Sequence, residues 1–388
     1  MGADSLHVLM TEPTPRPRPA RRPEPVAGRR RGWRRAVILG AAGALLLAGC
    51  SSPSRHKAAV TTSAPTTTTV PPVDCPLTGE PAPGNAVPAR PALAVKVDNY
   101  QAARPQTGLD KADMIFEEPV EGGITRYVAV FHCQNASLVG PVRSARNIDI
   151  GILTQFGSPL LVHVGGINPV LANIDASPII NVDLGANGQL ITTAPGRYAP
   201  YATYTSTAAV WALKSSDTTI PAPVFAFSSV VPSGGTPVAS VAIPFSSNSN
   251  VVWQYDAATK EFLRFYGTTP DMLSTGVQNT AANVIVQTVN VTYGPWLENE
   301  EGGLEVQAQL YGTSGPMELF RNGVGITGTW QRAGESSPTV LMNSAGQPLP
   351  LQPGQTWIEL VPSFVQVTTT SPPAPAVTTT TTTTTTKG

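Results

Sequence analysis

The stretch ITRYVAVFHC, Ile124 to Cys133, is the segment that most clearly predicts a β-strand. Its side chains alternate between two faces, as the two-residue period of a strand requires. Val128 and Val130 lie on one face, whereas Tyr127 and Phe131 lie on the other. Further strands in the same half of the chain are expected over 92–100, 114–117 and 159–164.

Helical patterns alternate with these strands. A first helix is expected to begin with Ser144 as its N-cap, because serine accepts a hydrogen bond from the free N–H groups of a first turn. A second is expected with Asn168 as its cap and Pro169 in the first helical position, and a third over 206–213. Strands that alternate with helices indicate a layered α/β or α+β arrangement.

The second half of the chain is nearly all β in pattern. The runs NVVWQYD and EFLRFYG flank AATK (257–260) and predict a β-hairpin. A second hairpin is predicted at Asn322-Gly323, since Asn-Gly suits a two-residue turn. Long alternating strands are expected over 283–294 and 303–312, and a last strand over 356–362.

The composition divides the chain into five parts. We expect an α+β fold, with a mixed α/β N-terminal domain over 90–238 and a smaller β-rich C-terminal domain over 239–366. Residues 1–49 are predicted to be a lipoprotein signal peptide. Residues 50–89, rich in Pro, Thr and Ser, predict a disordered linker, and the Thr-rich residues 367–388 predict a disordered tail.

The first 50 residues carry a targeting signal. Nine of the 25 Lys and Arg lie before residue 36, and the uncharged run AVILGAAGALLLAG follows. This run is shorter than the roughly 20 residues that span a bilayer, and its flanks are typical of a secretory signal peptide. It ends in LAGC, where Cys50 matches a lipobox cysteine that receives a diacylglyceride; the alternative is an ordinary signal peptide with a coincidental cysteine. We expect anchoring to membrane lipid through Cys50, on the extracytoplasmic face of the cell membrane.

Charge and cysteine usage limit the possible partners. Beyond residue 49 the chain keeps 16 of its 25 Lys and Arg and 22 of its 25 Asp and Glu, a net charge of −6, so nucleic acid is not an expected partner. Outside the cytosol Cys75 and Cys133 could form a disulfide, and two free thiols are the alternative. No Cys and His spacing resembles a zinc site and no nucleotide-binding motif occurs, so neither metal nor cofactor is expected.

The segment GPVRSARNIDIGI places Arg143 and Arg146 at the start of the first expected helix. The first turn of a helix carries partial positive charge, so two cations there are unfavourable unless a negative group faces them. If an acidic turn nearby supplies that group, the residues form an internal ion-pair network. If the arginines are not neutralised in this way, their donors suit a carboxylate or phosphate ligand. The acidic residues of the turn are Glu117, Glu118 and Glu121.

The same glutamates are candidates for catalysis, because glycan hydrolysis uses paired carboxylates. Alternation puts Glu117 and Glu118 on opposite faces of a strand, so one site cannot use both without a bend. Asp98 at a strand end and His163 before a double glycine could assist. The alternatives are a turn role for Asp98 and a hydrogen-bonded core role for His163. The expected ligand-binding residues are Arg143, Arg146, Arg104 and Asn168.

Three stretches resemble the YerB-like family of bacterial lipoproteins. They are ARPQTGLDKADMIFEEPVEGGITRYVAVF, GPVRSARNIDI and LQPGQTWIELVP, within a resemblance over about 90–365. The resemblance implies a membrane-anchored protein with an N-terminal domain and a smaller C-terminal domain, and it implies no particular activity. Family members often carry a histidine after the Ala-Pro of the segment RYAPYATYTS, where this chain has Tyr201, so a mechanism with a histidine base there is not expected.

These observations favour a lipoprotein that binds an anionic or glycan component of the cell envelope, such as peptidoglycan or another wall polymer. One alternative is a hydrolase or lyase that acts on wall glycan with a glutamic acid as the proton donor. Another is a scaffold that binds proteins of envelope synthesis. Because no motif for a nucleophile or a metal accompanies the glutamates, we favour binding over catalysis.

Overall fold

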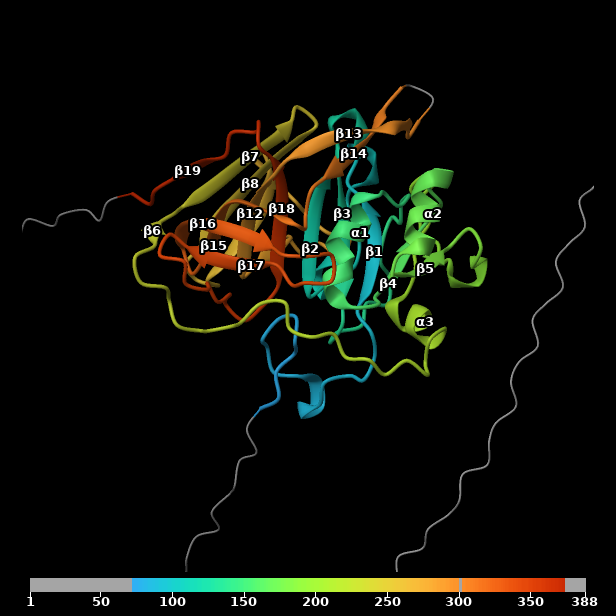
Figure 1. The fold of residues 1–388 in the computed structure, drawn as a ribbon, viewed down its shortest axis with the longest axis horizontal. Coiled ribbons are helices and arrows are strands. Elements are labelled where there is room, and N and C mark those ends of the chain that lie inside the picture. Colours follow the sequence, from blue (N-terminus) through green and yellow to red (C-terminus); the bar gives the residue numbers. More distant parts are fainter. Residues whose placement is uncertain (1–71, 300–301, 374–388) are drawn as a thin grey trace, which may run out of the picture. The chain divides into compact units, whose positions relative to one another are not determined.

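The computed structural model describes residues 72–299 and 302–373 (Figure 1). The predicted signal peptide, Cys50 and residues 51–71 of the predicted linker lie outside the described residues, as do residues 374–388 of the predicted tail. The described part is mostly β, and its largest sheet mixes parallel with antiparallel pairs. None of its helices has the length and apolar character needed to cross a bilayer.

An eleven-stranded sheet organises the described residues. From the part of the chain up to residue 237 it takes β1 (Leu93–Asp98), β2 (Met114–Pro119), β3 (Thr125–Phe131), β4 (Leu160–His163), β5 (Ile180–Asp183) and β6 (Thr236–Pro237). From the second half it takes β12 (Asn283–Val289), β15 (Thr313–Arg321), β16 (Val324–Arg332), β17 (Val340–Asn343) and β18 (Thr356–Pro362). The strand order is β17-β16-β15-β12-β18-β2-β3-β1-β4-β5, and β6 pairs with β16.

Strand β18 joins the two halves of the chain. It lies between β12 and β2 and runs parallel to both, so that the sheet continues across the predicted domain boundary at 238. Every residue of β18 is buried. Burial of both faces is typical of parallel strands inside a sheet, where other elements cover each side. The predicted strand over 356–362 is therefore confirmed, and it occupies the centre of the sheet.

A second sheet packs against the first, as Figure 1 shows for β7 and β8. It comprises β7 (Ser240–Ser246), β8 (Ser249–Asp256), β9 (Glu261–Tyr266), β10 (Thr269–Pro270), β11 (Thr280–Ala281) and β19 (Thr368–Thr370). The predicted hairpin around 257–260 is confirmed as β8–β9. The predicted hairpin at Asn322-Gly323 is confirmed between β15 and β16, with φ values of 51° and 73° that suit a type I′ turn.

The expected strand over 283–294 is divided between two sheets. Strand β12 ends at Val289, and the chain then leaves the large sheet to form β13 (Val291–Leu297). This strand pairs with β14 (Leu304–Ala308) in a separate two-stranded sheet, which we call the β13–β14 arm. Alternation is the same on both sides of the junction, so the sequence pattern does not mark it.

The two faces of β3 contribute to two different apolar cores, as its alternation predicts. Tyr127 and Phe131 belong to the core between the two sheets, where they are grouped with Trp253 of β8. Val128 and Val130 belong to the core on the opposite face, which helices α1 and α2 cover (Figure 1). The predicted strand over 124–133 is therefore confirmed, together with its faces.

Two of the three predicted helices begin later than the sequence predicts, and the second begins one residue earlier. They are α1 (Ile148–Leu153), α2 (Asn168–Ala176) and α3 (Thr207–Ala212). Ser144 is not the cap of α1, because residues 143–146 precede the helix and bond to neighbouring chain segments: the amide of Arg143 donates to Lys96 O at 2.9 Å and that of Ala145 to Gly165 O at 3.0 Å. Asn168 is the first residue of α2, with Ile167 as its cap.

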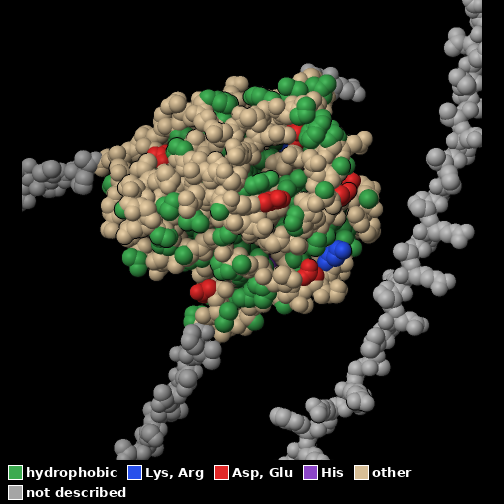
Figure 2. All heavy atoms as spheres, in the orientation of Figure 1, with side chains coloured by type: hydrophobic (Ala, Val, Ile, Leu, Met, Phe, Trp, Pro, Cys, Tyr) green, Lys and Arg blue, Asp and Glu red, His purple; other side chains and the backbone are tan. Residues whose placement is uncertain are grey.

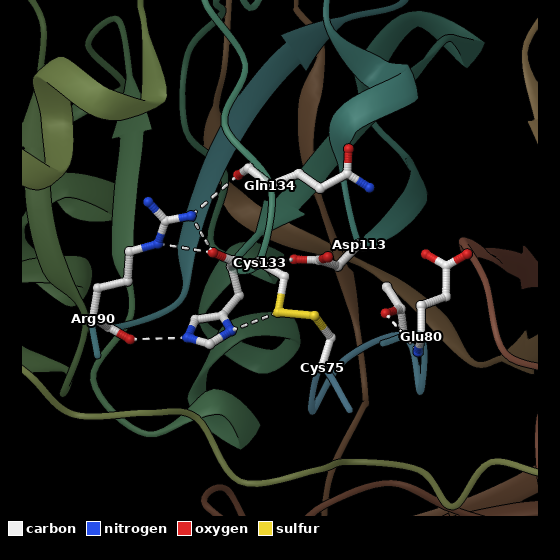
Figure 3. The surroundings of a disulfide bond; sticks show 8 residues. Cys75, Glu80, Arg90, Asp113, Cys133 and Gln134 are labelled. Atoms are coloured by element: carbon white, nitrogen blue, oxygen red, sulfur yellow. Dashed lines mark hydrogen bonds between the residues drawn. A yellow bond between two sulfur atoms is a disulfide. The ribbon is translucent and has the colours of Figure 1, made fainter. Parts of the chain in front are cut away.

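Both predicted disordered segments extend too far into the fold. Leu77 is fully buried, and Cys75 forms a disulfide with Cys133 that ties this segment to the residues after β3 (Figure 3). The amide of Cys133 also donates to Asp113 at 3.2 Å, and burial raises the pKa of that carboxyl to about 7. At the other end, residues 368–370 form β19 by pairing with the edge of β7. The disulfide and the pairing of β19 with β7 thus give a fixed structure to segments whose composition alone predicts disorder.

Candidate functional site

Arg146 is a buried arginine surrounded by carboxylates. Its Nε donates to Glu121 Oε2 at 2.9 Å, and its Nη2 donates to the other oxygen of the same carboxylate. Its Nη1 lies 3.2 Å from Glu298 Oε2 and donates to the carbonyl of Ala145 at 2.8 Å. The expectation of a negative partner is met by two glutamates, although Arg146 precedes α1 and does not lie in its first turn.

Arg143 is bound differently. Its Nε lies 3.1 Å from Asp98 Oδ2 at the end of β1, and one third of the side chain is exposed, against 4% for Arg146. The Asp98 carboxylate is buried and held in place by the amide of Tyr100, which donates to its other oxygen at 2.9 Å. Among the described residues no acceptor takes a hydrogen bond from the two Nη groups of Arg143, so both can reach a ligand.

These side chains line an open cleft of about 600 Å³, which we call the arginine cleft. Its volume is within the range of small-molecule sites. The lining combines three arginines, three carboxylates, two tyrosines and small polar side chains. Its residues include Asp98, Tyr100, Glu121, Arg126, Arg143, Ser144, Arg146, Tyr201, Asn248, Glu298 and Asn299.

The charged side chains in the cleft differ in how fully they are paired with opposite charges and hydrogen-bond partners. Burial would raise the pKa of Glu121, but the hydrogen bond from Arg146 and the charge of Arg126 outweigh it and lower that pKa to about 2. Burial raises the pKa of Glu298 above its ordinary value, against the opposing charge of Arg146. Glu121 is therefore a fixed anion, whereas Glu298 holds its proton more readily. Within the described residues, Nε of Arg126, Nε of Arg143 and Oε1 of Glu298 are buried without a hydrogen-bond partner, so the contact of Arg143 with Asp98 is an ion pair only.

Two tyrosines flank the Asp98–Arg143 pair. Tyr100 is 44% exposed, and Tyr201 is partly exposed next to the same pair. Burial and the nearby Asp98 charge raise the pKa of Tyr201, so it carries a neutral hydroxyl. Tyr201 stands at the position where the resemblance leads us to expect a histidine in many relatives, and it lines the cleft.

Glu117 does not belong to the arginine cleft. Its side chain points toward the second sheet, where Oε2 accepts a hydrogen bond from Arg264 at 2.5 Å and Oε1 accepts one from Thr125 at 2.6 Å. The same Arg264 also binds Asp271 at 2.6 Å, and Glu117, Arg264 and Asp271 are all buried. Glu117 therefore takes part in an internal ion-pair network that joins β2 to β9.

Glu118 lies on the opposite face, as the alternation predicts. It pairs with the buried Lys96, which also binds Asp149 of α1 at 2.6 Å. Burial raises the pKa of Glu118 to about 8, although the charge of Lys96 acts in the other direction. All three side chains have no exposed surface, so they cannot reach a ligand without a change in the fold.

Three other candidates lie away from the cleft. His163 is buried, and its ring nitrogens form hydrogen bonds with Gly165 O at 2.9 Å and with Asn181 at 2.7 Å. It is therefore the hydrogen-bonded core histidine of the alternative interpretation. Arg104 stacks on Tyr266, 3.3 Å from its ring centre, so it does not join Arg143 and Arg146. Asn168 is exposed at the start of α2 and does not line the cleft.

Sequence reasoning missed Arg126, Glu298 and the tyrosines of this site. Arg126 lies on the same face of β3 as the buried valines, and only its burial next to Glu121 makes it part of the cleft. Glu298 follows β13, more than 150 residues after Arg146 in the chain, and no local pattern links the two.

In the described part of the chain, no group of three or more His, Cys, Asp or Glu side chains is arranged to hold a metal ion. On the face shown in Figure 2, Lys and Arg side chains form no basic stripe.

Comparisons with known proteins cover both halves of the chain. Residues 77–219 match the model described as "Protein of unknown function (DUF3048) N-terminal domain", and residues 241–358 match the corresponding C-terminal domain. The "Putative lipoprotein YerB" of Bacillus subtilis (strain 168) is 30% identical over 300 residues, which are 74% of this chain and 86% of that protein. The crystal structure of the Bacillus subtilis YerB protein superposes with a TM-score of 0.64 at 25% identity, covering 76% of this chain and 99% of that chain.

Proposed function

This chain belongs to the DUF3048 family, and from that membership we propose that it is a lipid-anchored protein of the extracytoplasmic face of the cell membrane. The anchor would be Cys50, outside the described residues, as the lipobox predicts. In that location its ligand would be an anionic glycan of the envelope, such as peptidoglycan or another wall polymer. We place this ligand in the arginine cleft.

The state of Arg143 is the observation that supports this proposal most directly. Asp98 engages only its Nε, so the two Nη groups point a pair of donors at the cleft. Paired guanidinium donors match the geometry of a carboxylate or a phosphate. Arg146, by contrast, is occupied by two glutamates and supports the site from behind. Arg143 would therefore contact the acidic group of the ligand.

The other lining residues suit a sugar. Tyr100 and Tyr201 offer aromatic rings and hydroxyls next to the acidic group's expected position. Asn248, Asn299 and Ser144 supply amide and hydroxyl groups that can exchange hydrogen bonds with sugar hydroxyls. A cleft of about 600 Å³ with a few placed polar groups has the size of a binding site for a small number of sugar units.

Hydrolysis of the glycan has less support. A general acid needs a proton near neutral pH, but Glu121 has a pKa of about 2 and is held by Arg146. Glu118 has a raised pKa but no exposed surface. Glu117 is buried with Arg264 on the other face of β2. The three glutamates predicted for catalysis thus occupy three different environments, and none of them pairs with His163.

Calorimetric titration with peptidoglycan fragments and anionic wall polymers tests the proposal. Arg143→Ala removes a charge-assisted interaction of about 1.5–3 kcal/mol, so binding should weaken about 10- to 150-fold. Lys111→Ala is the matched control, because Lys111 is a partly exposed cation paired with Asp110 at 3.0 Å outside the cleft. If the wild type and Arg143→Ala bind every effective ligand equally, the arginine cleft is not the binding site.

A further inference from the structure

A second cleft lies on the other side of the turn that bears Glu121. It has a volume of about 440 Å³ and is enclosed by the residues after β2, the β13–β14 arm and the chain after β18. Most of its lining is apolar. Its main apolar residues are Val120, Ile124, Phe245, Tyr293, Leu304 and Phe364. We call it the apolar groove.

The rim of the apolar groove exposes large side chains to solvent. Phe364 is 67% exposed, Tyr293 63% and Leu304 42%. Single exposed apolar residues are common, but a group of them around one concavity indicates an interaction site. The one charged residue in its lining is Glu121, whose carboxylate is already bound by Arg146. The groove therefore suits a hydrocarbon more than a polar chain.

The apolar groove and the arginine cleft share a wall. Glu121, Gly122 and Ile124 line both, so a ligand can pass from one to the other around the exposed Gly122. One side of this wall offers the free donors of Arg143, and the other offers an apolar surface. A molecule with an anionic head and a hydrocarbon tail matches that order of surfaces.

We propose that the envelope glycan is bound in a lipid-linked form, as a long-chain lipid whose head carries a phosphate next to the sugar, with the head in the arginine cleft and the first part of the chain in the apolar groove. This inference rests on the proposed function, because it assigns the anionic group of the envelope ligand to a lipid. The paired Nη donors of Arg143 would hold the phosphate oxygens. Burial of the chain would favour binding because it removes apolar surface from water.

The test compares ligands that share a head or a tail. Native mass spectrometry of the full-length chain, released from a non-ionic detergent, gives the bound fraction for hexadecyl phosphate, glycerol phosphate and hexadecanol. We expect hexadecyl phosphate to bind at least tenfold more tightly than either of the others. Equal binding of hexadecyl phosphate and glycerol phosphate would overturn the lipid inference and leave the proposed function intact. Absence of hexadecyl phosphate binding would overturn it as well, whatever else occupies the groove.

Two variants distinguish the contribution of the phosphate head to binding from that of the hydrocarbon tail. Phe364→Gln should weaken hexadecyl phosphate binding threefold or more without changing glycerol phosphate binding, because it alters only the apolar groove. Val230→Gln is its matched control, since Val230 is 72% exposed and does not line the groove. Arg143→Ala should weaken both phosphates. If Phe364→Gln and Val230→Gln have the same effect, the chain does not enter the apolar groove and the inference fails.

Discussion

Replacing Glu121 by glutamine removes one negative charge from the arginine cleft and keeps the size of the side chain. The pKa of Glu121 falls from 4.5 to about 2 in the folded protein, with Arg146 and Arg126 as the favourable partners. At 1.36 kcal/mol per pKa unit, the ionised carboxylate contributes about 3 kcal/mol to the free energy of unfolding. We expect Glu121→Gln to lose about this amount at pH 7, since it leaves a buried arginine poorly paired.

The pH dependence of this loss has a definite sign. The folded-state pKa lies below the unfolded one, so the stabilisation is complete above about pH 4.5 and disappears as the pH falls toward 2. The difference in unfolding free energy between wild type and Glu121→Gln should therefore be largest at pH 7. At pH 3 it should be less than half as large, because the carboxylate of the unfolded chain is then protonated while that of the folded protein is still mostly ionised.

Urea unfolding followed by tryptophan fluorescence at pH 7, 5 and 3 measures the difference. Asp110→Asn is the matched control, because Asp110 is a partly exposed carboxylate paired with Lys111. A surface pair of this kind contributes about 0–1 kcal/mol. The reasoning is refuted if Glu121→Gln destabilises no more than the control at pH 7, or if its effect is the same at pH 3.

Three further substitutions test the fold. Cys75→Ser opens a disulfide whose cysteines lie 58 residues apart, and chain entropy predicts a loss of about 4 kcal/mol, measurable by thermal unfolding with and without reductant. Arg264→Met leaves Glu117 and Asp271 buried without their cation, so urea unfolding should show a loss of about 3–5 kcal/mol. Gly323→Ala adds a Cβ at a φ of +73° and 2.4 Å from a tyrosine ring atom of β8, so a loss of about 1–3 kcal/mol is expected; an unchanged melting temperature would show that the hairpin adapts.

Local patterns predict most strands of this protein, but they do not predict which strands lie next to each other in the sheet. The alternation over 124–133 identifies β3 and its two faces, because the side-chain period of a strand is local information. The position of β18 between β12 and β2 depends on parallel pairing of segments that lie far apart in the chain. No turn signal connects such strands, so the sequence pattern could not show that one sheet includes both halves.

The site was predicted only in part, for a related reason. The sequence singles out Asp98 at a strand end, Glu121 in an acidic turn, and Arg143 and Arg146 before an expected helix, and the structure brings all four to one cleft. Alternation correctly predicts that β2 directs Glu117 and Glu118 to opposite faces, but it does not show that only Glu121, in the turn after β2, reaches Arg146.

The helix argument for the two arginines was wrong in its geometry but identified the relevant charges. Residues 143–146 lie before α1 and bond to neighbouring chain segments, so the partial charge of a helix end does not decide their environment. The requirement for an anion comes from burial instead, because a cation taken out of water needs compensation. Arg146, 4% exposed, has two carboxylates; Arg143, one third exposed, has one, at its Nε only. An anionic ligand at the Nη groups of Arg143 would give it the second partner that Arg146 already has.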